Sequence, residues 1–271
     1  MRDEWANWLE PIRVLAAEAS DRILEIYATA FGVTAKGDDS PLTAADLAAH
    51  HAIVAGLQRL TPDIPVLSEE SSDIPFAERA RWRRFWLVDP LDGTKEFIQR
   101  NGQFTVNIAL IEEHEPVLGI VRVPVTGVCY FAVRDHGAFR EGPGQPPQPI
   151  AVKPLQPGEP LRVVGSRSHG GPGLQAFVAK LGTHELVTIG SSLKFCQVAE
   201  GSADVYPRLG LTSEWDTAAA QAIVEVAGGR VVSAETGESL RYNTRESLLN
   251  PYFIVYGDAS RDWLSYVPRE D

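Results

Sequence analysis

Apolar side chains recur at three- and four-residue steps over the first thirty residues, which is the spacing of one face of an α-helix. We expect this helix to end near Gly32. A second helix is expected after Thr43, with Leu47, Val54, Leu57 and Leu60 on its apolar face. The following apolar runs predict strands at 65–67, 85–88, 104–111, 117–123 and 128–133. The hairpin-like spacing of the last three predicts a largely antiparallel sheet flanked by the two helices.

Strands and helices alternate in the second half of the chain. The pattern predicts strands at 161–164, 186–189, 203–206, 231–232 and 253–255, and helices at 174–181, 193–199 and 217–227. Such alternation favours a layered α/β arrangement with some parallel pairing. Between the halves, the proline-rich segment from Gly142 to Pro160 breaks the periodicity, although a short strand is expected at 150–152. We therefore predict an N-terminal α+β subdomain, residues 1–157, and a C-terminal α/β subdomain, residues 158–271.

The charge balance narrows the class of partner. The 271 residues carry a formal net charge of −11. This acidity argues against nucleic acid or an anionic membrane as the main partner. If such a protein binds a phosphorylated small molecule, we expect metal ions to offset the repulsion between the two.

The cysteine content and the N-terminal sequence indicate where in the cell the protein is expected. Cys129 and Cys196 both lie in apolar surroundings and are expected to be buried thiols instead of a disulfide. The N-terminus lacks the basic-then-apolar order of a signal peptide. No apolar run approaches the ~18 residues that a membrane span needs. The cytoplasm is the expected location, and peripheral attachment to the inner membrane stays an alternative.

The segment Asp89–Phe97 is the first candidate for chemistry. It follows the strand expected at 85–88 and leads into a helix, so Asp89 and Asp92 lie where one element gives way to the next. Gly93 permits a tight turn beside them. Hard divalent cations bind carboxylate oxygens, and phosphates bind amides at a helix N-terminus. The structural alternative is that Asp92 caps the helix and Asp89 only ends the strand.

Three further acidic positions allow both a structural and a functional interpretation. Glu69 and Glu70 follow an expected strand and could form a solvated turn. Asp216 precedes an alanine-rich helix, where a carboxylate is an ordinary helix-start residue. Thr43 and Asp46 have the spacing of a capping box. Asp46 could equally accept a proton through a neighbouring hydroxyl.

Other catalytic schemes fit the sequence poorly. The chain contains no H-E-x-x-H pattern, no G-x-S-x-G elbow and no G-x-x-x-x-G-K-[ST] loop. Phosphatases that form an aspartyl-phosphate typically carry D-x-D-G-T near the N-terminus. Here Asp89 and Asp92 are three residues apart and far from the N-terminus, which disfavours that chemistry.

Taken together, the acidic motifs resemble those of the inositol monophosphatase superfamily of metal-dependent, lithium-sensitive phosphatases. Its signature D-P-[IL]-D-G-T-x-x-F matches Asp89–Phe97, and W-D-x-A-A matches Trp215–Ala219. Its acidic pair matches Glu69 and Glu70. The chain departs from the family at Ala220, where glycine is usual.

Within the superfamily, the chain is most similar to the CysQ branch of bacterial 3′(2′),5′-bisphosphate nucleotidases. Lys95-Glu96, inside the first signature, and the segment Gly190–Cys196 carry this similarity. The resemblance implies a layered αβαβα sandwich with its site between the halves. It also implies hydrolysis of the 3′-phosphate of adenosine 3′,5′-bisphosphate to AMP and phosphate without a covalent intermediate, in sulfur assimilation or recycling of that nucleotide. Inositol monophosphate or fructose 1,6-bisphosphate hydrolysis, or non-catalytic binding of metal and nucleotide, are the alternatives.

The resemblance further implies a Mg²⁺ site with about two or three ions. Glu69, Asp89 and the carbonyl of Leu91 are the expected ligands of one ion. Asp89, Asp92 and Asp216 are those of a second, so that Asp89 bridges. Glu70 is expected to hold the attacking water, and Thr94, with Asp46 behind it, to take the proton of that water.

For the substrate, the resemblance implies that the amides of Gly93 and Thr94 hold the phosphate to be cleaved. Ser191, Lys194 and Arg208 are expected to recognise the remaining 5′-phosphate and adenine. The alternative for Lys194 is a plain surface position on its helix. A homodimer is compatible with the resemblance.

Overall fold

The computed structural model describes residues 2–29, 33–35, 41–166 and 171–268. Its N-terminal part is built on a seven-stranded sheet in the order β3-β4-β5-β6-β7-β8-β9. The strands are β3 (Val66–Ser68), β4 (Arg84–Asp92), β5 (Thr105–Glu112), β6 (Glu115–Arg122), β7 (Cys129–Val133), β8 (Gly137–Glu141) and β9 (Gln148–Pro149). Only β3 and β4 pair in parallel, so the expected, largely antiparallel sheet is confirmed. A separate small ribbon joins β1 (Val33–Ala35) to β2 (Pro41–Thr43).

Helices α1 (Arg2–Tyr27) and α2 (Ala44–Leu60) cover one face of this sheet. The first helix therefore ends before Gly32, which lies outside the described residues. In α2 the expected apolar face is partly wrong. Leu57 is buried, but Leu47 is 38% exposed, and Ile53 takes the inward position instead. Leu57 and Ile53 are four residues apart, which is the spacing of side chains on one face of a helix.

The C-terminal part carries a five-stranded sheet in the order β11-β10-β12-β14-β13. Its strands are β10 (Leu161–Ser166), β11 (His184–Ile189), β12 (Val205–Arg208), β13 (Arg230–Ser233) and β14 (Phe253–Tyr256). Strand β10 pairs in parallel with both β11 and β12, whereas β14 pairs antiparallel with its neighbours. The helices are α5 (Pro172–Ala179), α6 (Leu193–Ala199) and α7 (Ala218–Val226). The predicted partial parallel pairing is thus confirmed.

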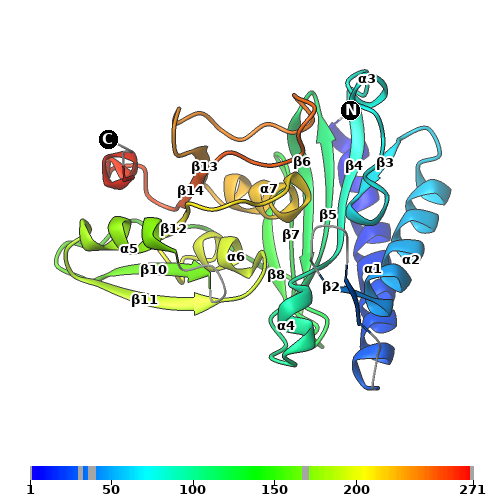
Figure 1. Cartoon of the computed structure of the whole chain (residues 1–271), viewed down its shortest axis with the longest axis horizontal. Coiled ribbons are helices and arrows are strands. Elements are labelled where there is room, and N and C mark those ends of the chain that lie inside the picture. The colour runs from blue at the N-terminus through cyan, green and yellow to red at the C-terminus, as the bar shows by residue number, and fades with distance from the viewer. Residues whose placement is uncertain (1, 30–32, 36–40, 167–170, 269–271) are drawn as a thin grey trace.

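Five layers result, with α6 and α7 between the two sheets (Figure 1). Helix α5 belongs to an outer layer, because its Phe177 packs with Val163 on one face of the second sheet. The adjacent Val164 belongs to the core on the other face. That central core draws on both halves, from Leu87 of β4 to Val255 of β14. The expected αβαβα sandwich is confirmed.

The central helix α7 lies directly against β6. A Cβ added to Gly119 would come within 2.1 Å of the carbonyl oxygen of Ala219. A glycine is required here because the helix backbone rests on the strand backbone. This close approach fixes the start of α7 relative to the first sheet.

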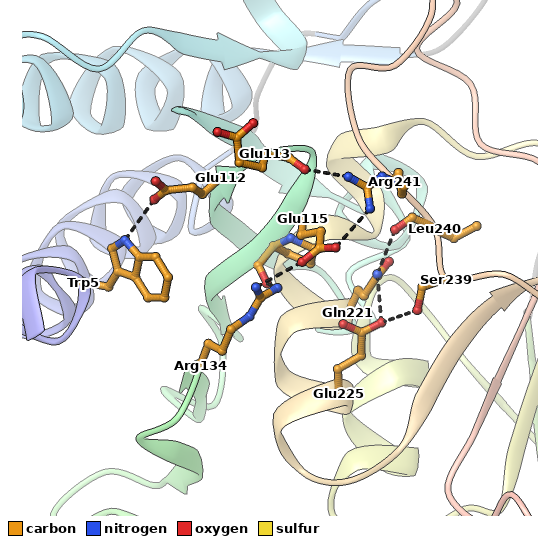
Figure 2. A network of polar contacts seen from close by, with 11 residues as sticks. Trp5, Glu112, Glu113, Glu115, Arg134, Gln221, Glu225, Ser239, Leu240 and Arg241 are labelled. Carbon is orange, nitrogen blue, oxygen red and sulfur yellow. Dashed lines mark hydrogen bonds and ion pairs between the residues drawn. The ribbon is translucent and has the colours of Figure 1, made fainter. Parts of the chain in front are cut away.

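A network of polar contacts holds the far end of α7, as Figure 2 shows. Arg241 Nη1 donates to Glu115 Oε1 at 3.0 Å, and Glu115 also pairs with Arg134 at 3.0 Å. Gln221 Nε2 donates to Glu225 Oε1 at 3.0 Å and to the carbonyl of Leu240 at 3.1 Å. These contacts join the first sheet, α7 and the segment after β13.

Some elements were not predicted from the sequence. Strands β8 and β9 and the short helix α3 (Phe76–Arg79) lie in polar segments without a strong period. The helix expected after Asp92 is present as α4 (Thr94–Ile98). The strand expected at 150–152 is wrong. Val152 donates its amide to the carbonyl of Ala227 at 3.0 Å, in a segment that crosses between the sheets. Both cysteines are free and buried, as expected. None of the described helices is long and apolar enough to span a membrane.

Candidate active site and metal centre

Asp89 and Asp92 lie on the face of the first sheet that contacts α6 and α7. Phe85 and Leu87 belong to the core on this side, so strand alternation carries Asp89 there too. The pairing of β4 with β5 then shifts by one residue between Asp89 and Asp92. Because of this bulge, Asp92 reaches the same side three residues later, while Leu91 joins the core under α1 and α2.

Asp216 completes an acidic group with these two residues. One carboxylate oxygen from each of the three lies within 4.8 Å of the others. Asp216 ends a 3₁₀ turn, η2 (Glu214–Asp216), just before α7, and its Oδ2 accepts the amide of Ser213 at 2.9 Å in a capping box. The helix-start interpretation of Asp216 is therefore correct, and it leaves the other oxygen for a second contact.

The capping alternative fails for Asp92. The N-cap of α4 is Gly93, in the left-handed region at φ 94°, with no side-chain cap. Asp92 Oδ2 instead accepts the amide of Ser192 at 2.5 Å. Asp89 Oδ1 accepts the amide of Leu91 at 3.0 Å, which fixes its rotamer. Both carboxylates are thus held by backbone amides.

The electrostatics of the group favour a bound cation. Burial raises the pKa of Asp89 and of Asp216 well above the ordinary value, and neighbouring carboxylates raise both further. Burial raises the pKa of Asp92 to about 6, while Lys194 and the Ser192 amide act in the opposite direction. Clustered carboxylates with little access to water repel one another, and all are the hard oxygen donors that divalent ions such as Mg²⁺ prefer. The residues present therefore fit a divalent metal.

Glu69 and Asp46 also face this group, although less closely. Glu69 lies in the 3₁₀ turn η1 (Glu69–Ser71), and its charge raises the pKa of all three aspartates. Among the described residues, however, the set with oxygens within 4.8 Å contains only the aspartates. Asp46 is fully buried in α2, and its charge acts on Asp89. The alternative capping box with Thr43 involves a side chain outside those described.

A cavity of about 260 Å³ lies between the halves of the chain. It collects nearly all the expected site residues. The first half contributes Glu69, Asp89, Leu91, Asp92, Gly93 and Thr94, and the second contributes Ser191, Lys194, Arg208 and Asp216. Asp46 and Glu70 are not among the described residues that form its wall. The charge of Glu70 acts instead on His50 of α2.

The three residues expected to recognise the nucleotide also line this cavity. Ser191 adopts a left-handed backbone at φ 49°, and its buried hydroxyl makes no hydrogen bond with the described residues. Lys194 is buried, not a surface residue, and its ammonium donates to the carbonyls of Ser191 and Ile189. Burial lowers the pKa of Lys194 to about 8. Arg208 donates to the carbonyl of Leu211 at 2.6 Å, and its Nε lacks a described partner.

Several residues at the site were not identified from the sequence. Ser192, Thr105 and Asn107 are buried and hydrogen-bonded beside Asp92. A signal was present, since Thr105 and Asn107 are polar residues two apart inside the apolar run 104–111. Glu96 is also buried, and it lines the cavity next to Gly93. In the sequence it is indistinguishable from an exposed helical glutamate.

Comparisons with known proteins agree with this geometry. Residues 4–258 match the model of the inositol monophosphatase family. The chain is 54% identical over 250 residues to the 3′(2′),5′-bisphosphate nucleotidase CysQ of Salmonella typhimurium, which covers 91% of this chain and 98% of the relative. Among solved structures, CysQ from Bacteroides thetaiotaomicron is 43% identical with a TM-score of 0.82, covering 94% of this chain and 98% of that one. An inositol monophosphatase of Thermotoga maritima shares the fold, with a TM-score of 0.78 and 24% identity over 96% of both chains. The fold, the acidic motifs and these matches together establish that the chain belongs to the inositol monophosphatase family.

Proposed function

We propose that this chain is a Mg²⁺-dependent phosphatase that removes the 3′-phosphate of adenosine 3′,5′-bisphosphate, giving AMP and phosphate. The observation that carries the proposal is that acidic and basic side chains line the same cavity. Asp89, Asp92 and Asp216 supply its carboxylates, and Lys194 and Arg208 supply positive charge. A substrate with two phosphates suits such a site, because one group can lie by the metal and the other by the basic residues. The names of the CysQ relatives support this substrate class.

The residues that would hold the metal are proposed to be Glu69, Asp89, Asp92, Asp216 and, through its carbonyl, Leu91. When bound, Mg²⁺ supplies positive charge to the phosphate and lowers the pKa of a bound water. The role of the chain is to hold these oxygens ready, and the amides of Leu91, Ser192 and Ser213 do so for the three aspartates. Such preorganisation avoids a rearrangement during the reaction.

Proton transfer is assigned to Thr94, with Asp46 behind it and Glu70 holding the water. Thr94 lies in the cavity wall at the start of α4. Its Oγ1 would take a proton from the attacking water and pass its own to Asp46, whose charge already acts on the site. A nucleophilic side chain is not needed in this scheme. It therefore predicts no covalent intermediate.

Ser191, Lys194 and Arg208 are proposed to bind the 5′-phosphate and the adenosine. The unpartnered Ser191 hydroxyl and Arg208 Nε are buried donors in the cavity region, and a phosphate oxygen can accept from both. Lys194 adds positive charge while its ammonium holds the turn that carries Ser191. A place in sulfur assimilation, a cytoplasmic location and homodimer formation are further parts of the proposal.

The decisive test compares initial rates with Mg²⁺ on three substrates. These are adenosine 3′,5′-bisphosphate, inositol 1-phosphate and fructose 1,6-bisphosphate. We expect the adenosine bisphosphate to be preferred by at least about tenfold in kcat/KM, a difference of about 1.4 kcal/mol in transition-state binding. Equal preference for inositol phosphate would overturn the substrate assignment. Binding of metal and nucleotide in a calorimeter without phosphate release would support the non-catalytic alternative.

A variant tests the metal assignment. Asp89→Ala should abolish turnover and leave a folded protein. Asp63→Ala, which changes an exposed aspartate after α2, is the matched control and should retain full activity. Undiminished hydrolysis by purified Asp89→Ala would contradict the proposed ligand set.

A further inference from the structure

Ser192 connects the second half of the chain to the acidic group. It lies in the turn between β11 and α6, and its amide donates to Asp92 Oδ2 at 2.5 Å. Its hydroxyl oxygen is 2.8 Å from Asn107 Oδ1 and 2.8 Å from Thr105 Oγ1, both on β5. Ser192, Asn107 and Thr105 are each at most 2% exposed. One residue thus contacts a candidate metal ligand through its backbone and the first sheet through its side chain.

The direction of these hydrogen bonds follows from their chemistry. Asn107 Oδ1 can only accept, so Ser192 Oγ must donate its single hydrogen to it. Thr105 Oγ1 must then be the donor in its contact with Ser192 Oγ. The hydroxyl of Ser192 is therefore bonded on two sides. This leaves the turn little freedom to move relative to β5.

The partners on β5 stand opposite the aspartates themselves. Asn107 pairs with Asp89 in the sheet register, and Thr105 pairs with Asp92 beyond the bulge. Asn107 carries a cost, because its Nδ2 is buried without a hydrogen-bond partner among the described residues. An apolar side chain would avoid that cost. The asparagine is therefore better explained by its bond to Ser192 than by packing.

Resting on the proposed function, we propose that Ser192 and Asn107 are positioning residues for the metal site. The hydrogen bond from Ser192 Oγ to Asn107 holds the Ser192 amide against Asp92 Oδ2. This amide in turn fixes the plane of the Asp92 carboxylate, which would orient it for a cation held by the three aspartates. A residue that orients a ligand in this way typically changes metal affinity about 10–100-fold when it is lost.

The test uses Ser192→Ala, which keeps the amide and removes the hydroxyl, and Asn107→Ala, which removes the acceptor without altering the turn. We expect each variant to weaken Mg²⁺ binding, measured by calorimetry, by about tenfold or more. Because both remove the same hydrogen bond, the double variant should bind Mg²⁺ about as weakly as either single one. The kcat for the adenosine bisphosphate should fall at limiting Mg²⁺ while its KM changes little.

A matched control separates positioning from general stability. Ser20→Ala removes another buried serine hydroxyl, which donates to the carbonyl of Ala16 at 2.7 Å within α1. It should lower the unfolding temperature without changing the Mg²⁺ affinity. Unchanged Mg²⁺ affinity in Ser192→Ala and Asn107→Ala, beside normal binding by the unaltered protein, would overturn the positioning role alone. If the unaltered protein binds no Mg²⁺ and releases no phosphate, the proposed function itself fails.

Discussion

Carboxylate oxygens of Asp89 and Asp216 lie within 4.8 Å of each other, although one belongs to a strand of the first sheet and the other precedes a helix of the second half. Asp89 is buried and Asp216 is half-buried, and the pKa of each is raised well above its ordinary value. Two such groups cannot both be charged cheaply in the absence of a cation. The folded state therefore carries a cost that a bound metal removes.

We predict that Asp216→Asn raises the stability of the metal-free protein and abolishes turnover. The amide oxygen can still accept from the Ser213 amide, so the capping turn is preserved. Each pKa unit relieved corresponds to about 1.4 kcal/mol. We therefore expect the unfolding temperature in EDTA to rise by at least about 2–4 °C. In Mg²⁺ the order should reverse, because only the unaltered protein gains from binding.

Asp258→Asn serves as the control for this change of charge. A hydrogen bond from the Ser260 hydroxyl, followed by those from the Leu155 and Ser260 amides, lowers the pKa of Asp258, so its charged form is favoured. Neutralising it should not stabilise the protein. A lower unfolding temperature of Asp216→Asn in EDTA would argue against charge repulsion at the site.

Lys194→Met tests the recognition of the second phosphate. If the ammonium attracts the 5′-phosphate, its loss should raise the KM for adenosine 3′,5′-bisphosphate by about 10–100-fold, as for a hydrogen bond to a charged group. The effect should shrink strongly on adenosine 3′-monophosphate, which lacks that phosphate. Lys153→Met, at an exposed position, is the control. Equal KM effects on both substrates would mean that Lys194 acts only by holding the Ser191 turn.

Gly119→Ala tests the contact between α7 and the first sheet. The added methyl would overlap the carbonyl of Ala219, so the helix must move. Overpacking of this kind costs about 1–3 kcal/mol, which urea unfolding can measure. Because Asp216 immediately precedes α7, Mg²⁺ affinity should fall as well. Gly142→Ala, where an added Cβ would meet only the Gln145 side chain at 3.4 Å or more, should change neither property.

Glu225 predicts a dependence of stability on pH. Burial raises its pKa, and hydrogen bonds from Ser239 and Gln221 only partly offset this. Arg134 also lowers the pKa, and Glu115 raises it. Because the pKa of Glu225 is higher in the folded state, the folded state binds the proton more tightly than the unfolded state. The stabilisation from this proton is complete below the pKa of the unfolded state and is lost as pH rises through the pKa of the folded state. Glu225→Gln should therefore flatten the fall in unfolding free energy as pH rises above about 4, the ordinary pKa of a glutamate.

The measurement is urea unfolding in EDTA at several pH values in that range. Glu238→Gln, an exposed glutamate beside Ser239, should leave the slope unchanged. An identical slope in Glu225→Gln and the unaltered protein would contradict the assignment of this pH dependence to Glu225.

The sequence predicts the regular elements well because their periods are strong. The apolar runs of β4 to β7 and the alternation after residue 161 give the two sheets directly. Strands β8 and β9 were missed because both are short, β8 is half-buried and β9 is exposed, so little apolar signal distinguishes them from a loop. The division at residue 157 stays a prediction.

The site shows a similar limit. The resemblance named the acidic residues, but periodicity alone would place Asp89 and Asp92 on opposite faces of a strand. Only the bulge between them brings them together. The sequence could not show that Lys194 is buried, because its position in a helix does not reveal which other elements pack over that helix. Ser192 was missed because its contacts lie on a distant strand.

The core that joins Leu87 to Val255 has a consequence for synthesis of the chain. When the first sheet has left the ribosome, the face that α7 will cover is still without its partner. A nascent chain at this stage presents a broad apolar surface and unshielded carboxylates to the cell. We therefore expect a fragment of residues 1–157, expressed alone, to be insoluble or bound to chaperones, and to become soluble when the remaining residues are supplied.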